Sequence, residues 1–203
     1  MLFRSKEGLV LLSVYLFYKS FVLYDEAKIL EVNVKIYRNK FETLEKEIKP
    51  SRDFIDTELI PQWEKGNTAN LEKIADRLLQ RMSRHSTELQ QLIQAIRQDI
   101  KAGGSNQMWS PFLAAGGFVL CVGSLTVRPT PNVATPPSGV IGNAGWVSIP
   151  VCVAAIGTAG YSWLSYSSLS NTLAELEMLE KDATTMGQEI TRYQSQLKLI
   201  SPK

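Results

Sequence analysis

The residue types that carry most enzymatic chemistry are scarce in this sequence. Its 203 residues include one histidine, His85, and two cysteines, Cys121 and Cys152. A nucleophilic cysteine needs a base to activate it, and neither cysteine has a histidine near it in the sequence. The sequence also has no Gly-x-Ser-x-Gly nucleophile motif and no Gly-x-x-x-x-Gly-Lys phosphate loop. We therefore predict that the protein is not an enzyme.

Neither the histidine nor the cysteines predict a metal site. His85 lies on the apolar face of a predicted helix, where it is either a pH sensor or, as we interpret it, a partly buried side chain with a hydrogen-bonded partner. A disulfide bond is geometrically allowed if the segments holding Cys121 and Cys152 pair antiparallel. We interpret both as small buried apolar residues. One histidine and two cysteines in apolar runs do not make a typical zinc site, so we predict no metal and no cofactor. Four carboxylates are interpreted as solubilising groups on charged helix faces: Glu42, Glu45, Glu175 and Glu177.

Charge is distributed very unevenly along the chain. Lys and Arg number 22 against 20 Asp and Glu, and this balance argues against a nucleic-acid partner. Between Met108 and Ala174 the only charged residue is Arg128. This gap holds two apolar stretches, Met108–Val127 and Trp146–Tyr166, each about as long as the roughly 20 residues that cross a bilayer. The sequence predicts a hairpin over 108–166, with its Pro/Gly-rich turn at 128–139.

The hairpin has further features typical of membrane segments. Trp109 begins one stretch, and Trp163 and Tyr166 end the other, where tryptophan and tyrosine favour the boundary between water and lipid. Small residues inside both stretches allow close helix packing in lipid. The alternatives are the core of a soluble globule and, for 118–122 and 147–153, β-strands. The predicted membrane-inserting residues are Trp109, Phe112, Phe118, Leu120, Trp146, Val153, Trp163 and Tyr166.

Apolar residues at helical spacing predict long helices on either side of the hairpin. The first extends from about residue 6 to 49 and ends at Pro50, because a residue that precedes proline disfavours helical geometry. A connector over 50–66 holds a short helix capped by Ser51 and is broken by Pro61 and Gly66. The second helix starts at Asn67 and stops at 103–106, a Gly-Gly-Ser-Asn sequence. The third covers 176–200.

These segments predict an all-α fold: an elongated bundle of heptad-patterned helices with an inserted apolar hairpin. We divide it into long helices at 1–107, the hairpin at 108–166 and a C-terminal coiled-coil helix at 167–203. The apolar run within residues 9–18 is interpreted as part of the first helix, with an uncleaved membrane anchor or a signal peptide as alternatives. The predicted bundle and oligomerisation residues are Leu30, Val34, Phe41, Leu78, Leu92, Leu179, Ile190 and Leu197.

This order of segments resembles the α-helical pore-forming toxins of the cytolysin A and tripartite enterotoxin type, which include haemolysin BL and the non-haemolytic enterotoxin. The features that match are the heptads at 23–48, 71–100 and 176–200 and the apolar insert at 108–166. The resemblance implies a soluble form that stows the hairpin, inserts it into a bilayer and assembles with copies of itself or with related helical subunits. The expected function is thus membrane insertion and permeabilisation.

Two other classes of protein fit the same pattern. One is a resident two-span membrane protein whose coiled coils act as a tether or oligomerisation scaffold. The other is a soluble helical adaptor with an apolar core. The toxin-like class and the resident class are both membrane-associated, the first as a secreted protein that inserts and the second as a permanent membrane protein. The sequence does not indicate the compartment.

Overall fold

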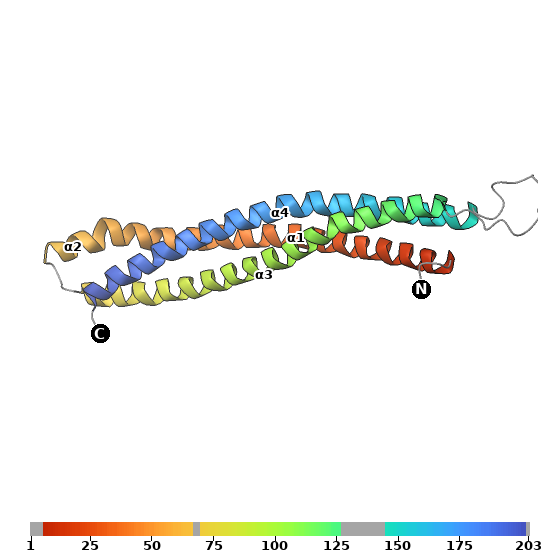
Figure 1. Cartoon of the computed structure of the whole chain (residues 1–203). Coiled ribbons are helices and arrows are strands. Elements are labelled where there is room, and N and C mark those ends of the chain that lie inside the picture. The colour runs from red at the N-terminus through yellow and green to blue at the C-terminus, as the bar shows by residue number, and fades with distance from the viewer. Residues whose placement is uncertain (1–5, 67–69, 127–144, 202–203) are drawn as a thin grey trace, which may run out of the picture. The chain divides into compact units, whose positions relative to one another are not determined.

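A computed structural model describes residues 6–66, 70–126 and 145–201, without the side chains of residues 6, 7, 9, 121–126 and 145–150 (Figure 1). Within these ranges the regular structure is helical, and no strand is present. The predicted all-α class is therefore confirmed. The alternative of strands at 118–122 and 147–153 is wrong, because both segments are helical. The predicted turn at 128–139 lies outside the described residues.

Long helices make up most of the described chain. The elements in chain order are α1 (Lys6–Phe54), a five-residue π-helix η2 (Ile55–Leu59), α2 (Ile60–Glu64), α3 (Leu71–Thr126) and α4 (Gly145–Ile200).

The chain forms two compact units, each built from segments of α1, α3 and α4. Unit 1 comprises Met1–Glu31 and Ala102–Leu173, and unit 2 comprises Val32–Lys101 and Ala174–Lys203. The residues up to Glu31 are thus grouped with the predicted hairpin segments. Because each unit has its own interior, we describe the two separately.

In unit 2, α3 runs antiparallel to α1. The amide of Asn33 donates a hydrogen bond to Asp99 (3.0 Å), while Arg81 donates one to Ser51 (3.5 Å), so residue numbers rise on one helix as they fall on the other. Ion pairs link α4 to both helices and place it parallel to α1. These pairs are Arg38–Glu175, Arg52–Glu189 and Arg97–Glu180.

The interior of unit 2 is apolar, as expected for a helical bundle in water. Among the described residues of unit 2, the buried polar side chains are Ser51, His85 and Ser201. Leucine, isoleucine, valine, methionine and alanine fill the rest of the core. The fully or nearly fully buried members include Ile55, Leu59, Met82, Leu89, Ile96, Leu176, Ile190 and Leu197.

The first helix passes through Pro50, contrary to the prediction that it ends there. Proline removes a backbone donor and crowds the preceding turn. Ile48, Ser51 and Ile55 are nevertheless all buried, so one continuous face of the helix packs into the core on both sides of Pro50. The helix is continued by tertiary packing, and the predicted cap at Ser51 is wrong because Ser51 lies inside α1.

The prediction that the second helix stops at 103–106 is also wrong, because α3 continues to Thr126. A Cβ atom added to Gly103 would lie 2.9 Å from the side chains of both Leu30 and Leu173. That distance is too short for a real contact, so a larger residue would force the ends of both leucine side chains to move. Gly103 therefore allows α1 and α4 to approach α3 closely inside unit 1.

The connector between α1 and α3 also differs from the prediction. Pro61 does not break a helix but occupies the first turn of α2, which follows the π-helix η2 directly. Gly66 follows α2 with a φ of +76°, which favours glycine. The predicted start at Asn67 lies outside the described residues, and α3 begins at Leu71, after Asn70 with a φ of +70°.

Candidate membrane-contacting surface

Unit 1 exposes large apolar side chains on all of its helical segments. The predicted membrane-inserting residues account for several of them, with 72% of Trp163, 70% of Phe118 and 64% of Val153 exposed. Trp109, Phe112 and Tyr166 are exposed as well. Leu120 is half-buried, and the side chain of Trp146 lies outside the described part.

The N-terminal part of α1 contributes to the same surface, and sequence reasoning placed none of its residues there. The signal was present in the apolar run over residues 9–18, but its residues also fit the helix register and were assigned to the bundle. The exposed apolar residues that the prediction missed are Leu11, Val14, Tyr15, Tyr18, Phe21 and Ile29 on α1, Met108 and Val119 on α3, and Ile156 and Leu164 on α4.

The interior of unit 1 is rich in hydroxyl groups. Among the described side chains of unit 1, the buried apolar ones are Ala27, Leu30, Val151, Ala155, Leu169 and Leu173. The buried polar ones are Ser13, Ser20, Ser110, Thr158, Ser162, Ser165 and Thr172. A folded domain in water normally has the opposite arrangement, with apolar side chains inside and polar ones outside.

Most of these hydroxyl groups are satisfied by the backbone of their own helix. Ser20 donates to the carbonyl of Leu16 (2.9 Å), and Thr158 donates to the carbonyl of Ala154 (2.8 Å). Such a bond to the preceding turn lets a hydroxyl lie away from water without losing its partner. The Ser110 hydroxyl, in contrast, is buried with no partner among the described residues.

Polar side chains also connect the helices of unit 1. The hydroxyl groups of Ser20 on α1 and Ser162 on α4 are hydrogen-bonded at 3.1 Å. Ser168 on α4 donates to the carboxylate of Glu31 on α1, and Asn106 on α3 donates to that of Glu26 (2.7 Å). Of these three, the Ser20–Ser162 bond is buried, and a hydrogen bond between helices stabilises their association most where no water competes for it.

Glycines bring the helices of unit 1 close together. A Cβ atom on Gly157 would lie 2.6 Å from the ring of Phe17, and one on Gly117 would lie 3.0 Å from the backbone oxygen of Ala155. Next to Gly157, the ring of Tyr161 on α4 contacts aromatic rings of α1. Small residues at close helix contacts are typical of membrane bundles, where packing drives association.

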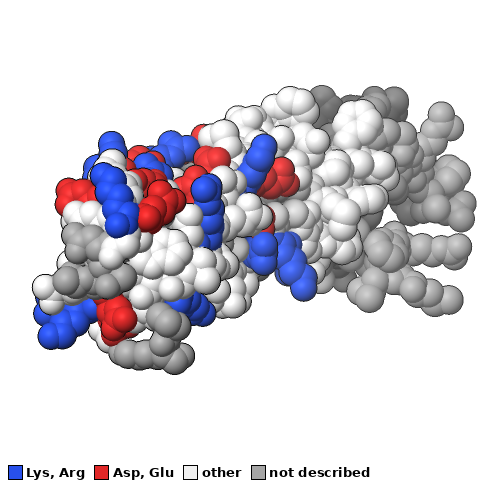
Figure 2. All heavy atoms as spheres, turned by 90° about the vertical axis from the view of Figure 1, so that its left-hand side faces the viewer, with Lys and Arg blue, Asp and Glu red and all other residues white. Residues whose placement is uncertain are grey.

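Among the described side chains of unit 1, most charged groups lie near the end of its α1 segment at Glu31. Lys28 pairs with Glu31 (2.9 Å), and Glu26 accepts the bond from Asn106, which lies three residues before Trp109. Exposed Lys19 is the one charged residue between residues 8 and 24, and its ammonium group lies 5.9 Å from the ring of Tyr15. Figure 2 shows charged side chains crowded over part of the visible surface and a broad area without any.

Cys152 corrects one interpretation of the sequence. We interpreted both cysteines as small buried residues, yet Cys152 is half-buried and disulfide-bonded. The chain has one other cysteine, Cys121, whose side chain lies outside the described part. A disulfide in an apolar helix adds a covalent constraint of the kind that stabilises a folded unit.

The residues predicted for the bundle lie apart from this apolar surface. Phe41 is half-buried, and Leu30 lies in the interior of unit 1. The remaining predicted residues are buried in unit 2: Val34, Leu78, Leu92, Leu179, Ile190 and Leu197.

Within the described ranges, no helix contains a stretch that is long and apolar enough to cross a membrane. No family model matches the chain, and no curated protein or solved structure shows significant similarity to it.

Proposed function

We propose that this protein acts at a lipid membrane and that unit 1 is the part in contact with lipid. The observation that supports this proposal is the inverted arrangement of unit 1, with aromatic and aliphatic side chains outside and hydroxyl groups inside. Each Å² of apolar surface left in water costs about 25 cal/mol. Contiguous apolar surface of this kind marks an interaction site, and lipid tails are the partner that needs no matching polar groups.

A resident membrane protein is the form of this proposal that the exposed residues favour. A protein that inserts on demand must cover its apolar surface beforehand, whereas Phe118, Val153 and Trp163 are exposed in the folded chain. In this proposal, unit 1 is the membrane anchor. Unit 2, with its apolar core and charged surface, is a coiled-coil tether or scaffold in water that associates with copies of itself or with related helical proteins.

Membrane permeabilisation is the second candidate function. The segment order that resembles helical pore-forming toxins supports it, and so do the hydroxyl groups inside unit 1. Ser20, Thr158 and Ser162 face other helices of the same chain, and in an oligomer such side chains would be suited to line a water-filled path.

The experiment for membrane contact places charges on the apolar surface of unit 1. We expect the double variant Phe118→Asp/Val153→Asp to lose flotation with liposomes, because a carboxylate loses its hydration when it contacts lipid tails, whereas an apolar side chain does not. Both positions are exposed, so the interior is untouched. The matched control is Met178→Asp/Leu199→Asp, at two exposed apolar positions of unit 2. Equal flotation of both double variants would refute lipid contact by unit 1.

Two further measurements separate the forms of the proposal. A resident protein needs detergent to remain in solution, while a conditional inserter is soluble without it and binds liposomes later. Release of a dye trapped in liposomes, compared between the full chain and a variant lacking residues 109–166, tests permeabilisation. Release by the full chain alone supports the second candidate. A chain that stays in solution without detergent and binds no lipid would leave the soluble adaptor.

A further inference from the structure

His85 is a buried histidine in unit 2, and within the described part of the chain one of its ring nitrogens lacks a hydrogen-bond partner. Only 7% of its side chain is exposed, and its Nδ1 atom has no hydrogen-bond partner among the described residues. The interpretation of His85 as a histidine with a hydrogen-bonded partner is thus not met at Nδ1. A buried polar atom without a partner costs about 1–3 kcal/mol. An atom of this kind needs an explanation, for which an unseen ion is one of the standard candidates.

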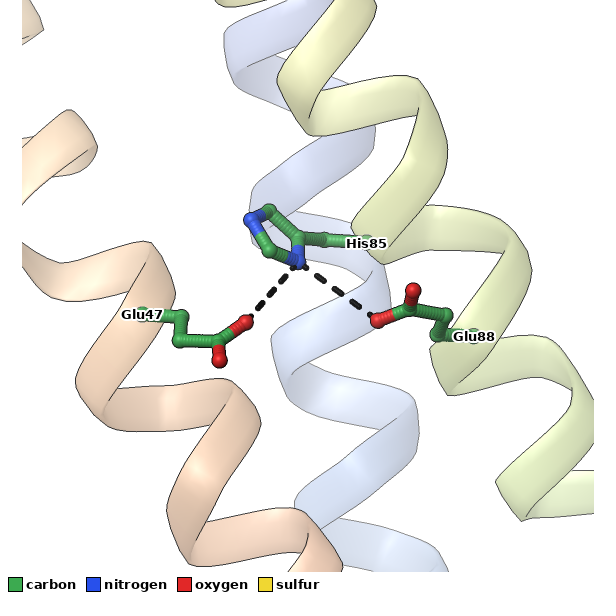
Figure 3. Close-up of side chains that lie close together, drawn as sticks. All are labelled: Glu47, His85 and Glu88. Carbon is green, nitrogen blue, oxygen red and sulfur yellow. Dashed lines mark ion pairs between the residues drawn. The ribbon is translucent and has the colours of Figure 1, made fainter.

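Two carboxylates point at the Nδ1 atom of His85 (Figure 3). Glu47 on α1 and Glu88 on α3 each place their Oε2 atom 3.8 Å from Nδ1 of His85. The three ligand atoms all lie within 4.8 Å of one another. A separation of 3.8 Å is too long for a hydrogen bond. It is close to the roughly 3.3 Å between two ligand atoms that share one zinc ion through bonds of about 2.0–2.2 Å.

The surroundings hold one of the carboxylates in place and leave room beside the imidazole. Arg84 binds the other oxygen of Glu88, with Nε 2.9 Å from Oε1, so Oε2 remains turned toward His85. Such support of a ligand by a neighbouring group is typical of protein metal sites. An open cavity of about 340 Å³ is lined by Glu47, Arg81, Arg84 and His85. It gives an ion a route from solvent and space for water in the remaining coordination positions.

We propose that Glu47, His85 and Glu88 bind one divalent transition-metal ion, with Zn²⁺ as the best match. An imidazole with two carboxylates is a donor set for such metals. Helical bundles build metal sites in the same way, with a carboxylate from one helix facing a carboxylate and a histidine three residues apart on another. The two carboxylates supply negative charge to the ion, part of which Arg84 already compensates at Glu88, and the ion joins α1 to α3 inside unit 2. The site extends beyond the proposed membrane function and does not depend on it.

One of the three proposed ligands lies far from the other two in the sequence, which explains why sequence analysis predicted no metal site. His85 and Glu88 are recognisable as neighbours on one helix face, at spacing i, i+3. Glu47 lies 38 positions before His85 in the sequence, and only the antiparallel packing of α1 on α3 brings it to the site. The alternative occupant of the same site is a proton on His85, which would form ion pairs with both carboxylates.

The test uses the full chain in detergent, freed of metal by a chelator and carrying no histidine tag. Because the chain has one histidine, labelling histidine with ¹⁵N gives a single pair of ring nitrogen signals. We expect one equivalent of Zn²⁺ to shift the Nδ1 signal at constant pH, and Mg²⁺ to leave it unchanged. A signal that responds to pH but not to Zn²⁺ would assign the site to a proton and overturn the proposal.

Substitutions supply the second readout, Zn²⁺ affinity measured by competition with a fluorescent chelator. We expect Glu47→Gln and His85→Gln to weaken binding roughly tenfold or more. Glu47 is exposed, so its variant tests the site even if the His85 variant fails to fold. The matched control is Glu45→Gln, an exposed carboxylate on the same helix that lines a different groove. Equal affinity of the Glu45 and Glu47 variants would overturn the proposal.

Discussion

Units 1 and 2 are built from the same helices but have opposite interiors. Unit 2 buries Leu89, Ile96 and Leu176 and has a charged surface with ion pairs such as Arg97–Glu180. Unit 1 buries hydroxyl groups and glycine contacts, and its large apolar residues lie outside. The buried face of each long helix is therefore mostly apolar in unit 2 and rich in hydroxyl groups or glycine in unit 1. Large apolar side chains lie mostly inside in unit 2 and outside in unit 1, the arrangement that the proposed contact of unit 1 with lipid would require.

The forces that hold each unit together differ accordingly. In unit 2, removal of apolar area from water supplies most of the stability, and exposed ion pairs add at most about 1 kcal/mol each. In unit 1 fewer large apolar side chains are buried, so close packing at Gly103, Gly117 and Gly157 and hydrogen bonds such as Ser20–Ser162 supply a larger share of the stability. Substitutions of similar chemistry should therefore have different effects in the two units.

The largest expected difference concerns the loss of an apolar side chain. We expect Leu89→Ala, in the core of unit 2, to lower the free energy of unfolding by about 2–5 kcal/mol because it leaves a cavity. Ile156→Ala, on the outside of unit 1, should change it by less than about 0.5 kcal/mol. Denaturant unfolding of the full chain in detergent, followed by circular dichroism, measures both. Equal losses would contradict the contrast between the two interiors.

A smaller difference is expected within α4 of unit 1, where two glycines differ in their surroundings. Gly157→Ala places a methyl group against Phe17 and should destabilise unit 1 by about 1–3 kcal/mol through overpacking. Gly160 has nothing within 4 Å of an added Cβ atom. Gly160→Ala should therefore leave stability unchanged or raise it by up to about 1 kcal/mol through better helix propensity. Thermal unfolding of the two variants compares them directly, and a more stable Gly157 variant would contradict close packing here.

The smallest effect is a pH dependence that comes from Tyr37 in unit 2. Burial, together with the hydrogen bond donated to Asp99 (2.8 Å), raises the pKa of Tyr37 to about 12 from an ordinary value of 10.0. The unfolded chain loses this proton first, so the contribution of Tyr37 to stability is complete below pH 10 and is lost as the pH rises toward 12. Tyr37→Phe should flatten this alkaline decline. Unfolding midpoints between pH 9 and about 12 check it, and an unchanged decline would argue against the Asp99 bond.

Periodicity predicted where helices exist much better than where they end. The apolar stripes led to helices α1, α3 and α4, but Pro50 and Gly103 were interpreted as ends and both lie inside helices. Their local cost is real. It is outweighed by contacts with residues far away in sequence, such as those of Leu30 and Leu173 with Gly103, and no local pattern reports such contacts.

Only part of the candidate surface was predicted, again because local sequence patterns do not report contacts between distant segments. Exposed aromatic residues of the charge-free segment, including Phe118 and Trp163, were identified from composition alone. The exposed residues of α1, such as Leu11 and Tyr18, were missed because the run over residues 9–18 was interpreted as part of a bundle helix. Only the packing of α1 against α3 and α4 decides which of its faces points outward.

The sequence by itself determined the helical class, the charge-free segment and the scarcity of catalytic groups, because composition and spacing are local properties of the chain. The tertiary structure alone decided that hydroxyl groups of unit 1 face inward and that α1 joins the apolar surface. It also brought Glu47 to His85 and Glu88 in unit 2. These features depend on which side chains from distant segments share a small volume, and that choice is made by helix packing.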